Sequence, residues 1–270
     1  MLTLTIDGKE VTAEPGALLL DVCRAHGCEV PALCHHPALP AHGACRLCTV
    51  EITEGGRSRL GASCCTIVSQ DMAVITDSPR VKRGRKVVAE LLLRRCPENQ
   101  TVRNLAARLG VDVDAVTGSL TPTDDNKDHN CVLCARCTRA CAQVGAFAIA
   151  MVDRGPQMHV GTPFNALSEA CIGCGSCAEI CPTGAICLDD HDGLRKVVRG
   201  DGVTSEQPLV RCSRCHQYFA TQKMLDHLAA KQPLGPDVPY QPELCPACNR
   251  LAWSEKLSGW PEELRKQEEG

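Results

Sequence analysis

The sequence predicts an α+β fold divided into several small domains instead of one large core. Two observations support this fold class. Short strand and helix patterns open the chain, and a helical stretch separates them from a second half rich in clustered cysteines. The 270 residues include 21 Cys but only three Phe, two Tyr and two Trp, so large apolar side chains are scarce. We therefore expect metal centres to supply much of the folding energy.

The first segment, residues 1–78, opens with a pattern typical of a hairpin followed by a helix. Alternating runs at 2–6 and 10–14 flank an Asp-Gly pair, which favours a tight hairpin turn. Residues 17–26 have a helical composition and end before a glycine, which commonly follows a helix. Strand, strand and helix is the order in which a β-grasp domain begins.

The second segment, residues 79–125, is expected to form a helical connector. Ser78 is a good capping residue and Pro79 suits a first helical turn, so a helix is predicted from there to Arg95, with a short one over 101–109. The predicted apolar face of the first helix consists of Val81, Val87, Val88, Leu91 and Leu92. Its basic run is expected to face solvent or, alternatively, to dock an acidic partner surface. That run consists of Arg80, Lys82, Arg83, Arg85 and Lys86.

The third segment, residues 126–200, contains one cysteine pattern twice. The runs at 131–141 and 171–181 each read C-x2-C-x2-C-x3-C, and a proline follows the second. In bacterial ferredoxins three cysteines of such a run hold one 4Fe–4S cluster and the fourth binds the other cluster. Disulfides do not explain this spacing, and zinc sites usually use separated C-x2–4-C pairs. The predicted sets are Cys131, Cys134, Cys137 and Cys181 for the first cluster, and Cys141, Cys171, Cys174 and Cys177 for the second.

Four further cysteines in the first segment are spaced as one distant residue, a close pair and a second distant residue. They are Cys34, Cys45, Cys48 and then Cys64 or Cys65. This layout is typical of a plant-type 2Fe–2S site, although its first gap is longer than the usual C-x4-C. A Rieske site would need two Cys–His pairs, and no histidine directly follows the close pair. We therefore expect His35 and His36 not to be ligands.

The last segment, residues 205–270, carries two C-x2-C pairs, Cys212 with Cys215 and Cys245 with Cys248. Four thiolates on two such turns predict one structural zinc ion, with a helix over 221–231 between the pairs. A single iron ion or a fourth cluster would use the same ligands. The first pair and the histidine after it also match the haem-attachment motif C-x-x-C-H, but attachment requires export and leaves the second pair without a role.

Composition excludes several classes of partner. The net charge of −3 predicts neither nucleic-acid binding nor membrane attraction. No apolar run approaches the roughly 18 residues of a membrane span, and the first residues lack the features of a signal peptide. Cysteines committed to metals fit a reducing compartment, so we expect a cytoplasmic protein. The sequence also lacks G-x-G-x-x-G, a P-loop and an evident nucleophile–base set, so no catalytic residue is predicted.

The residues at 31–39, 43–51, 161–165 and 182–185, taken with the cysteine patterns, resemble one group of proteins. The group comprises the large iron–sulfur subunit of respiratory complex I, the small diaphorase subunit of NAD-reducing hydrogenases, iron-only hydrogenases and some NAD-linked formate dehydrogenases. The resemblance covers roughly residues 1–190 and implies that Cys64, not Cys65, is the last 2Fe–2S ligand. One feature departs from it. In complex I and the diaphorase subunit the connector carries a further 4Fe–4S cluster on one His and three Cys, where this sequence offers Cys96 alone.

The resemblance implies a non-catalytic electron-transfer subunit of a soluble oxidoreductase complex. With one 2Fe–2S cluster and two 4Fe–4S clusters, it would relay single electrons between a flavin subunit that uses NAD(P)H and a catalytic subunit. That subunit would be a hydrogenase, a formate dehydrogenase or another enzyme with a low-potential donor. Two alternatives remain open, an independent polyferredoxin-type carrier and an iron–sulfur redox sensor or scaffold.

Overall fold

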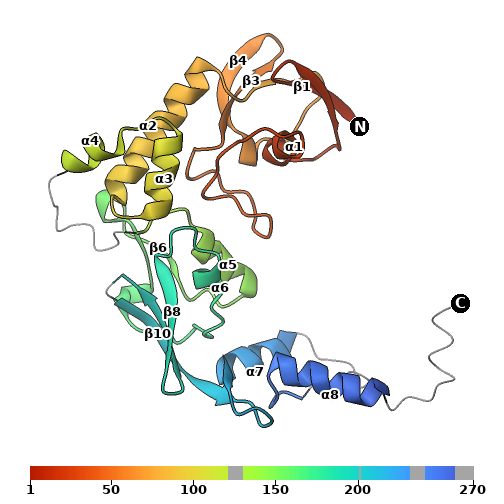
Figure 1. Cartoon of the computed structure of the whole chain (residues 1–270), viewed down its shortest axis with the longest axis vertical. Coiled ribbons are helices and arrows are strands. Elements are labelled where there is room, and N and C mark those ends of the chain that lie inside the picture. The colour runs from red at the N-terminus through yellow and green to blue at the C-terminus, as the bar shows by residue number, and fades with distance from the viewer. Residues whose placement is uncertain (121–129, 201, 232–240, 259–270) are drawn as a thin grey trace, which may run out of the picture.

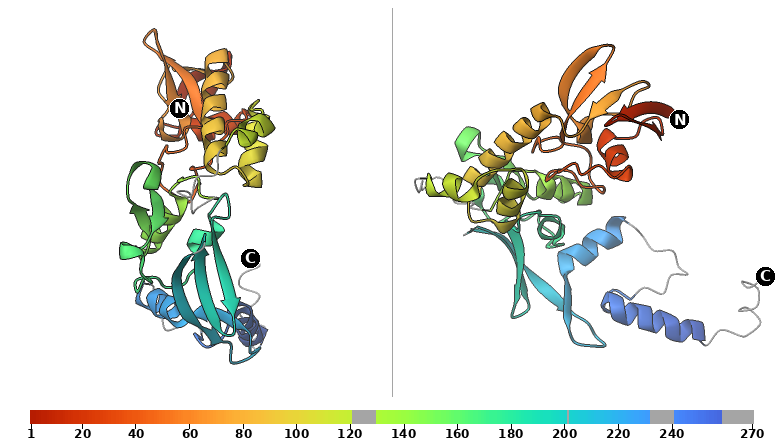
Figure 2. Two further views of the ribbon diagram at one scale, coloured as in Figure 1. Left: turned by 90° about the vertical axis from the view of Figure 1, so that its left-hand side faces the viewer. Right: turned by 45° about the horizontal axis from the view of Figure 1, so that its top comes forward.

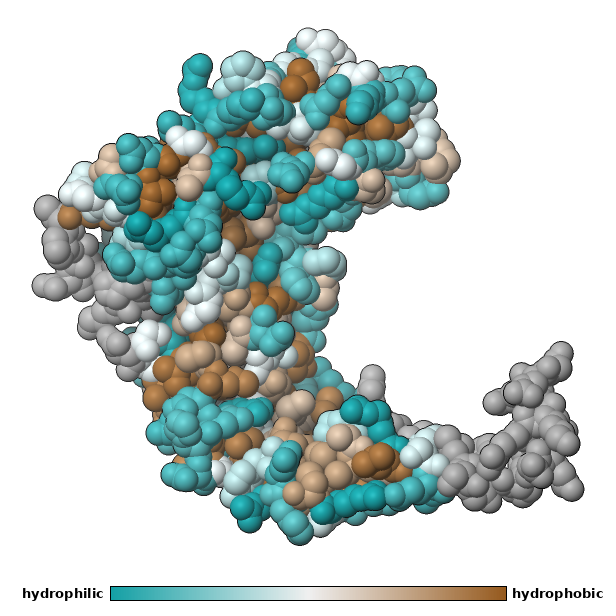
Figure 3. Space-filling model, in the orientation of Figure 1, coloured by the Kyte–Doolittle hydropathy of each residue, from teal (hydrophilic) through white to brown (hydrophobic). Residues whose placement is uncertain are grey.

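The computed structural model describes residues 1–120, 130–200, 202–231 and 241–258. Its parts follow one another along a curve, from an N-terminal sheet through connector helices and the cysteine-rich centre to the tail (Figure 1). The curve leaves an open concave side between the N-terminal domain and the tail (Figure 3). Among the described residues, no helix is long and apolar enough to cross a membrane.

A five-stranded mixed sheet forms the N-terminal domain, with the order β2-β1-β5-β3-β4. The predicted hairpin is confirmed, because β1 and β2 pair antiparallel and both turn residues, Asp7 and Gly8, have positive φ. β1 also pairs parallel with β5, which brings the two ends of the domain together. The elements are β1 (Leu2–Ile6), β2 (Lys9–Ala13), α1 (Leu19–Ala25), β3 (Thr49–Glu54), β4 (Arg57–Ala62), the 3-10 turn η1 (Ser63–Cys65) and β5 (Ala73–Ile75).

The core of this domain is mainly aliphatic. Because side chains alternate along a strand, every second residue of the central strands points inward. Leu4, Ile6, Val50, Ile52 and Val74 are all at most 2% exposed. The helix α1 adds Leu19 and Leu20, which are fully buried in the same core.

The connector consists of α2 (Pro79–Arg95), α3 (Gln100–Arg108) and α4 (Val113–Gly118); the end of the expected segment, 121–125, lies outside the described residues. Both predicted helices are confirmed. The Ser78 hydroxyl accepts a hydrogen bond from the Val81 N–H at 3.2 Å, as a helix cap does. Asn99 caps α3 in the same way, through the Val102 N–H at 3.2 Å.

The predicted apolar face of α2 is partly wrong. Val87 and Leu91 are 53% and 62% exposed, whereas the buried stripe consists of Val81, Arg85, Ala89 and Leu93, at helical spacing. Which side of α2 is buried depends on the elements that pack on it, namely β3, α3 and α4, and not on hydrophobicity alone. The basic run is therefore not wholly solvated. Arg85 is buried, and its Nε donates to the Thr49 carbonyl at 3.0 Å.

The cysteine-rich centre has little regular structure and is followed by a four-stranded antiparallel sheet, β11-β10-β9-β8. The expected limit between the centre and the tail, near 200–205, lies within this sheet, because β10 pairs with β9 on one side and β11 on the other. The elements are α5 (Arg136–Val144), β6 (Ala150–Val152), η2 (Gly155–Gln157), β7 (His159–Gly161), η3 (Pro163–Asn165), α6 (Ser176–Glu179), β8 (Ile186–His191), β9 (Leu194–Arg199), β10 (Gly202–Arg211), β11 (Tyr218–Thr221), α7 (Gln222–Lys231) and α8 (Pro246–Ser258).

One apolar cluster joins the N-terminal domain to the centre. It contains Leu33, Cys34, Cys45 and Leu47 from the first cysteine loop, and Val132 and Cys134 from the third segment. Between them lie Ala89, Leu93, Cys96, Val102, Ala106, Val111 and Val116 of the connector. The connector thus packs against both cysteine loops, which lie side by side in the views of Figure 2.

Candidate cluster and metal sites

The N-terminal cysteines form two facing pairs. The Cys34 N–H lies 3.5 Å from the Cys45 sulfur, and the Cys45 N–H lies 3.5 Å from the Cys34 sulfur. The sulfurs of Cys48 and Cys64 are 3.2 Å apart. All four side chains are buried, and a further hydrogen bond joins the Cys34 thiol to Cys64, so the two pairs form one group. Two irons, each held by one pair, fit this arrangement.

The four thiols of this group differ in their electrostatics. Hydrogen bonds with Cys34 raise the pKa values of Cys45 and Cys64 far above the ordinary value, whereas the pKa values of Cys34 and Cys48 are lowered. The hydrogen bond between the Cys48 and Cys64 thiols lowers the pKa of Cys48 to about 6. Hydrogen bonds from Cys45 and Cys64 likewise lower the pKa of Cys34 far below its ordinary value. A thiol that ionises near neutral pH is a ready metal ligand, since the metal binds the thiolate.

The structure distinguishes the adjacent cysteines of η1. Cys64 is fully buried and faces Cys48, whereas Cys65 is exposed, with its sulfur 3.7 Å from that of Cys64. The histidines also have other neighbours. His35 is buried with its Nε2 3.4 Å from Asp21 Oδ1, and the His36 ring accepts from the Ala38 N–H at 3.2 Å.

The first predicted 4Fe–4S set lines one cavity. Cys131, Cys134 and Cys137 meet Cys181 there, in a lining completed by Val132, Ala135, Val160, Thr183, Ala185, Ile186 and Arg199. The chain wraps this space because Leu133 and Ala135, between the cysteines, both have positive φ. The Ala185 N–H points to the Cys181 sulfur at 3.3 Å. Burial raises the pKa of the Cys137 thiol well above its ordinary value, so proton loss there needs the charge of a bound cluster.

The second predicted set lines a separate cavity. Cys141, Cys171, Cys174 and Cys177 surround it with Ala146, Ala148, Ile149, Ile172, Gly175, Ser176, Val197 and Thr204. The Ala148 N–H points to the Cys141 sulfur at 3.2 Å, and burial raises the pKa of Cys177 to about 12. Gly173 is required by a close approach as well as by its positive φ, because a Cβ there would lie 2.7 Å from Thr221 Cγ2.

The two cavities exchange their fourth cysteines. Cys137 and Cys141 lie one turn apart on α5, yet the first lines the first cavity and the second lines the other. Cys181 follows α6 and returns to the first cavity. The structure therefore brings each predicted set of four together, with the crossing that the sequence pattern predicts.

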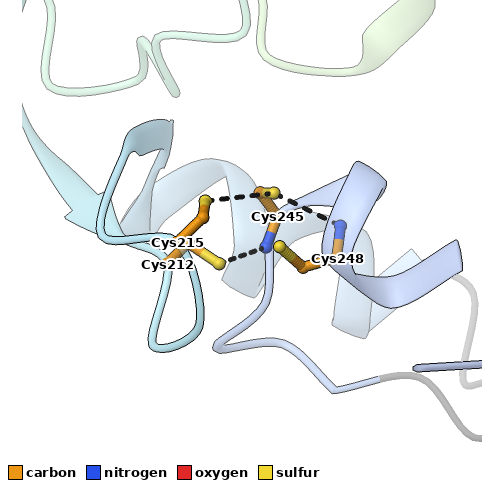
Figure 4. A group of neighbouring side chains, drawn as sticks. All are labelled: Cys212, Cys215, Cys245 and Cys248. Carbon is orange, nitrogen blue, oxygen red and sulfur yellow. Dashed lines mark hydrogen bonds between the residues drawn. The ribbon is translucent and has the colours of Figure 1, made fainter. Parts of the chain in front are cut away.

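The four tail cysteines meet at one point (Figure 4). Their sulfurs all lie within 4.8 Å of one another. Cys212 and Cys215 occupy the turn between β10 and β11, and Cys245 and Cys248 the start of α8, with the Cys245 N–H 3.3 Å from the Cys212 sulfur. A tetrahedral ion with Zn–S bonds of about 2.3 Å holds its sulfurs roughly 3.8 Å apart. In a cubane each thiolate binds a different iron, which needs wider spacing, so this group fits a single ion better than a cluster.

Arginines that sequence patterns do not reveal hold the cluster loops by their backbone carbonyls, and three of them come from three different elements. Arg139 donates to the Cys34 carbonyl, Arg95 Nε to that of Cys131 at 2.8 Å, and Arg195 Nη1 to that of Gly173 at 3.1 Å. Each guanidinium comes from a different element and reaches a loop at least 22 positions away. No local signal marks such contacts, because the partner is a carbonyl that every residue has.

Family models cover both cluster regions. Residues 1–79 match the model described as a 2Fe-2S iron-sulfur cluster binding domain, and residues 130–186 match a 4Fe-4S dicluster domain. The fold and these matches define an iron–sulfur protein that binds a 2Fe–2S cluster and a 4Fe–4S dicluster.

Several characterised proteins are similar over the same region. The chain is 32% identical over 223 residues to the NADP-reducing hydrogenase subunit HndD of Solidesulfovibrio fructosivorans, covering 73% of this chain and 37% of HndD. It is 31% identical over 209 residues to the mitochondrial 78 kDa subunit of the NADH-ubiquinone oxidoreductase of Candida albicans, covering 68% and 28%. It is 31% identical over 208 residues to the NADPH-Fe(3+) oxidoreductase subunit alpha of Geobacter sulfurreducens, covering 69% and 24%.

A solved structure shows the same relationship. A chain in the crystal structure of a NAD+-reducing [NiFe]-hydrogenase in the H2-reduced state is 27% identical, with a TM-score of 0.50, covering 60% of this chain and 74% of that one. The chain belongs to the 2Fe–2S plus 4Fe–4S dicluster proteins related to the large iron–sulfur subunit of complex I, HndD and the NAD-reducing hydrogenase subunit, so the predicted resemblance is confirmed. It is an iron–sulfur electron-transfer region homologous to subunits of multi-subunit oxidoreductases, and it spans 24–37% of the length of the three relatives named above.

Proposed function

We propose that this chain relays single electrons, within a cytoplasmic oxidoreductase complex, between a flavin subunit that uses NAD(P)H and a catalytic subunit. The catalytic subunit would be a hydrogenase, a formate dehydrogenase or another low-potential enzyme. The names of the relatives support a partner that uses NAD(P)H, because each name includes NAD, NADH, NADP or NADPH. The second partner differs among them, as hydrogenase, ubiquinone and Fe(3+) reactions are all named.

The observation that carries this proposal is a direct contact between the loop of the 2Fe–2S site and α5, which carries ligands of both predicted 4Fe–4S sites. Arg139 on α5 donates to the carbonyls of Cys34 and Pro40, and Arg136 donates to that of His35. The helix α5, which lines both 4Fe–4S cavities, is thereby hydrogen-bonded to the backbone of the 2Fe–2S loop. Arginine suits this task, because its planar fork can hold two carbonyls at once.

The connector supports a direct route between these two sites. Cys96 is fully buried in the apolar cluster that also contains Cys34, Cys45 and Cys134. Where the relatives in the resemblance carry a further cluster, this chain places closely packed aliphatic side chains. We infer that electrons pass from the 2Fe–2S site to the first 4Fe–4S site without an intermediate centre in this connector.

The ligand sets belong to this proposal. The 2Fe–2S cluster would bind Cys34, Cys45, Cys48 and Cys64, in a domain whose mixed sheet and α1 support a β-grasp fold. The two 4Fe–4S clusters would bind the two sets that line the central cavities. The four tail cysteines would bind zinc, whose binding energy, on the order of 10 kcal/mol, would fold the tail.

Metal analysis and potentiometric EPR of the anaerobically purified full chain test the cluster content. We expect roughly ten iron atoms per chain, from one 2Fe–2S and two 4Fe–4S clusters, together with one zinc. The isolated chain should not turn over NADH, hydrogen or formate, since no substrate site is predicted. Sustained turnover by the pure chain would contradict the relay function, and elution from its source cells as a free monomer would favour the carrier alternative.

An Arg139→Gln variant tests the route. Rapid-freeze EPR after a reductive pulse should show slower equilibration between the 2Fe–2S and 4Fe–4S signals, because the loop is no longer held. Arg139→Lys should recover only part of the rate, since one ammonium cannot replace the fork. The exposed Arg154 offers a matched control, and Arg154→Gln should leave the rate unchanged. Unchanged equilibration in Arg139→Gln would exclude this contact as the electron route.

A further inference from the structure

The segment formed by β11 and α7 lies against the second cluster site. Thr221, at the end of β11, is fully buried and donates its hydroxyl to the Ile172 carbonyl, between two of the cysteines of that site. Its methyl group occupies the space that a Gly173 side chain would need. The same hydroxyl accepts from the Met224 N–H at 3.2 Å and so caps α7. One side chain therefore joins the cluster loop to the start of this helix.

The C-terminal half of α7 contacts the C-terminal end of α5, the helix that carries Cys141. His227 Nε2 lies 2.8 Å and Lys231 Nζ 2.6 Å from the carbonyl of Val144, the last residue of α5. Near the start of α7, Lys223 Nζ donates to the Glu169 carbonyl at 2.9 Å. Carbonyls at a helix C-terminus carry partial negative charge, and a cation there is stabilising. α7 thus brings the Lys231 ammonium to the C-terminal end of α5, the helix that carries Cys141 of the second predicted set.

The other end of this segment is fixed by the four-cysteine site. The turn with Cys212 and Cys215 joins β10 to β11, and the Ser213 N–H donates to the Glu243 carbonyl at 3.0 Å. Arg214 pairs with Glu255 of α8 at 2.7 Å. Packing there is slight. Among the described residues its apolar cluster has three buried members, Cys212, Leu244 and Cys248, with Phe219, Cys245 and Ala252 partly buried against them. A metal ion is therefore the main force that can hold the β10–β11 turn and α8 together.

We propose that α7 is a positioning element of the second 4Fe–4S site and that metal in the four-cysteine site holds it there. The tail would then control the second cluster, leaving the other two centres unchanged. The potential of a cluster depends on nearby charge and hydrogen bonds, and α7 contributes both to the segments that carry the ligands of this site. The inference rests on the dicluster, but it does not require any particular redox partner.

Charge gives the first test, in the full chain with its clusters. Lys231→Met should lower the midpoint potential of one 4Fe–4S signal, because reduction adds negative charge that the ammonium no longer stabilises. The shift should shrink at high salt, since the group is exposed. Lys231→Arg should restore the potential. Lys256→Met, which removes an exposed lysine of α8, is the matched control and should leave all three potentials unchanged.

Metal loss gives the second test. Cys245→Ser should release the tail metal, and one 4Fe–4S cluster should then change its potential and bleach faster in air. The 2Fe–2S and the other 4Fe–4S signals should keep their potentials. Thr221→Val, which keeps the shape but not the hydroxyl, should produce the same selective lability, and Thr221→Ser should not.

The outcomes separate this inference from the relay function. If both 4Fe–4S clusters are present but neither responds to Lys231→Met or to loss of the tail metal, the tail does not position the second site and the inference is wrong. If all three centres respond equally, the tail stabilises the whole chain and has no selective effect, which also overturns it. If iron analysis shows that one 4Fe–4S cluster never forms in the unaltered chain, the proposed ligand sets are wrong, and the inference about α7 loses its basis.

Discussion

The N-terminal domain and the cysteine-rich centre are built on different physical principles. The first has an aliphatic core drawn from five strands and α1, whereas the buried cluster of the centre contains only Cys131, Cys137, Ile149, Val160, Ile186 and Val197 among the described residues. Two cavities lined by cysteines occupy the space that aliphatic side chains fill in the other domain. Apolar burial stabilises the one, and bound clusters must stabilise the other.

Removal of iron should produce the largest difference in stability between the two regions. In a chelator-treated, reduced full chain, the amides of α5 and of β8 and β9 should lose their protection from hydrogen exchange. Without the clusters the two central cavities are unfilled, and side chains of this size cannot close them. The amides of β1, β3 and β5 should stay protected, although the 2Fe–2S loop will loosen. Equal loss in both regions would show that the N-terminal core also depends on iron.

A substitution in the N-terminal core should have the opposite effect, destabilising that domain and sparing the centre. Ile52 is fully buried at the centre of the sheet, so Ile52→Ala should cost about 2–5 kcal/mol in the N-terminal domain. The 4Fe–4S signals should survive, because the centre does not share this core. Ile75, 46% exposed on the neighbouring strand β5, is the matched control, and Ile75→Ala should cost less than about 0.5 kcal/mol. Denaturant unfolding followed separately by the 2Fe–2S and 4Fe–4S absorbance measures both effects.

The two regions also differ in how far the sequence predicts them. The Asp7–Gly8 hairpin and the Ser78 cap are local signals, since the residues that specify them are those that form them, and both are confirmed. The grouping of the central cysteines around two cavities is predictable for a different reason. Iron imposes a fixed spacing on its ligands, so even the crossing of Cys141 and Cys181 between the two cavities can be read from the pattern.

Contacts chosen by tertiary packing could not be predicted. Val87 and Leu91 look like core residues and are exposed, while Arg85 looks like a surface residue and is buried. Which stripe of α2 faces inward depends on β3 and α3, whose positions the helix sequence does not contain. The same holds for Arg139, whose carbonyl partner on Cys34 is 105 positions away. The contact of α7 with the second cluster loop is another case, because the spacing of the tail cysteines predicts only their own site.

The smallest expected loss of stability concerns the contact between β3 of the N-terminal sheet and the start of α2 in the connector. The Ser78 hydroxyl caps α2 and also donates to Glu51 Oε2 of β3 at 2.7 Å. Ser78→Ala should cost about 1 kcal/mol, the usual value for a lost cap. Hydrogen exchange of the α2 amides in the iron-free full chain measures this at matched pH, without interference from acid loss of the clusters.

The pH dependence of this variant identifies the second contact. Hydrogen bonds from Ser78 and then Ser58 lower the pKa of Glu51 below its ordinary value. A carboxyl with a lowered pKa in the folded state stabilises the protein above its unfolded pKa of about 4.3, and this stabilisation is lost as the pH falls through the folded value. Ser78→Ala removes the largest cause of the shift, so the difference between it and the unaltered chain should narrow below roughly pH 4. In a Glu51→Gln background residue 51 cannot titrate, so the difference should stay constant over the same window. A constant difference with Glu51 present would mean that Ser78 acts on α2 alone.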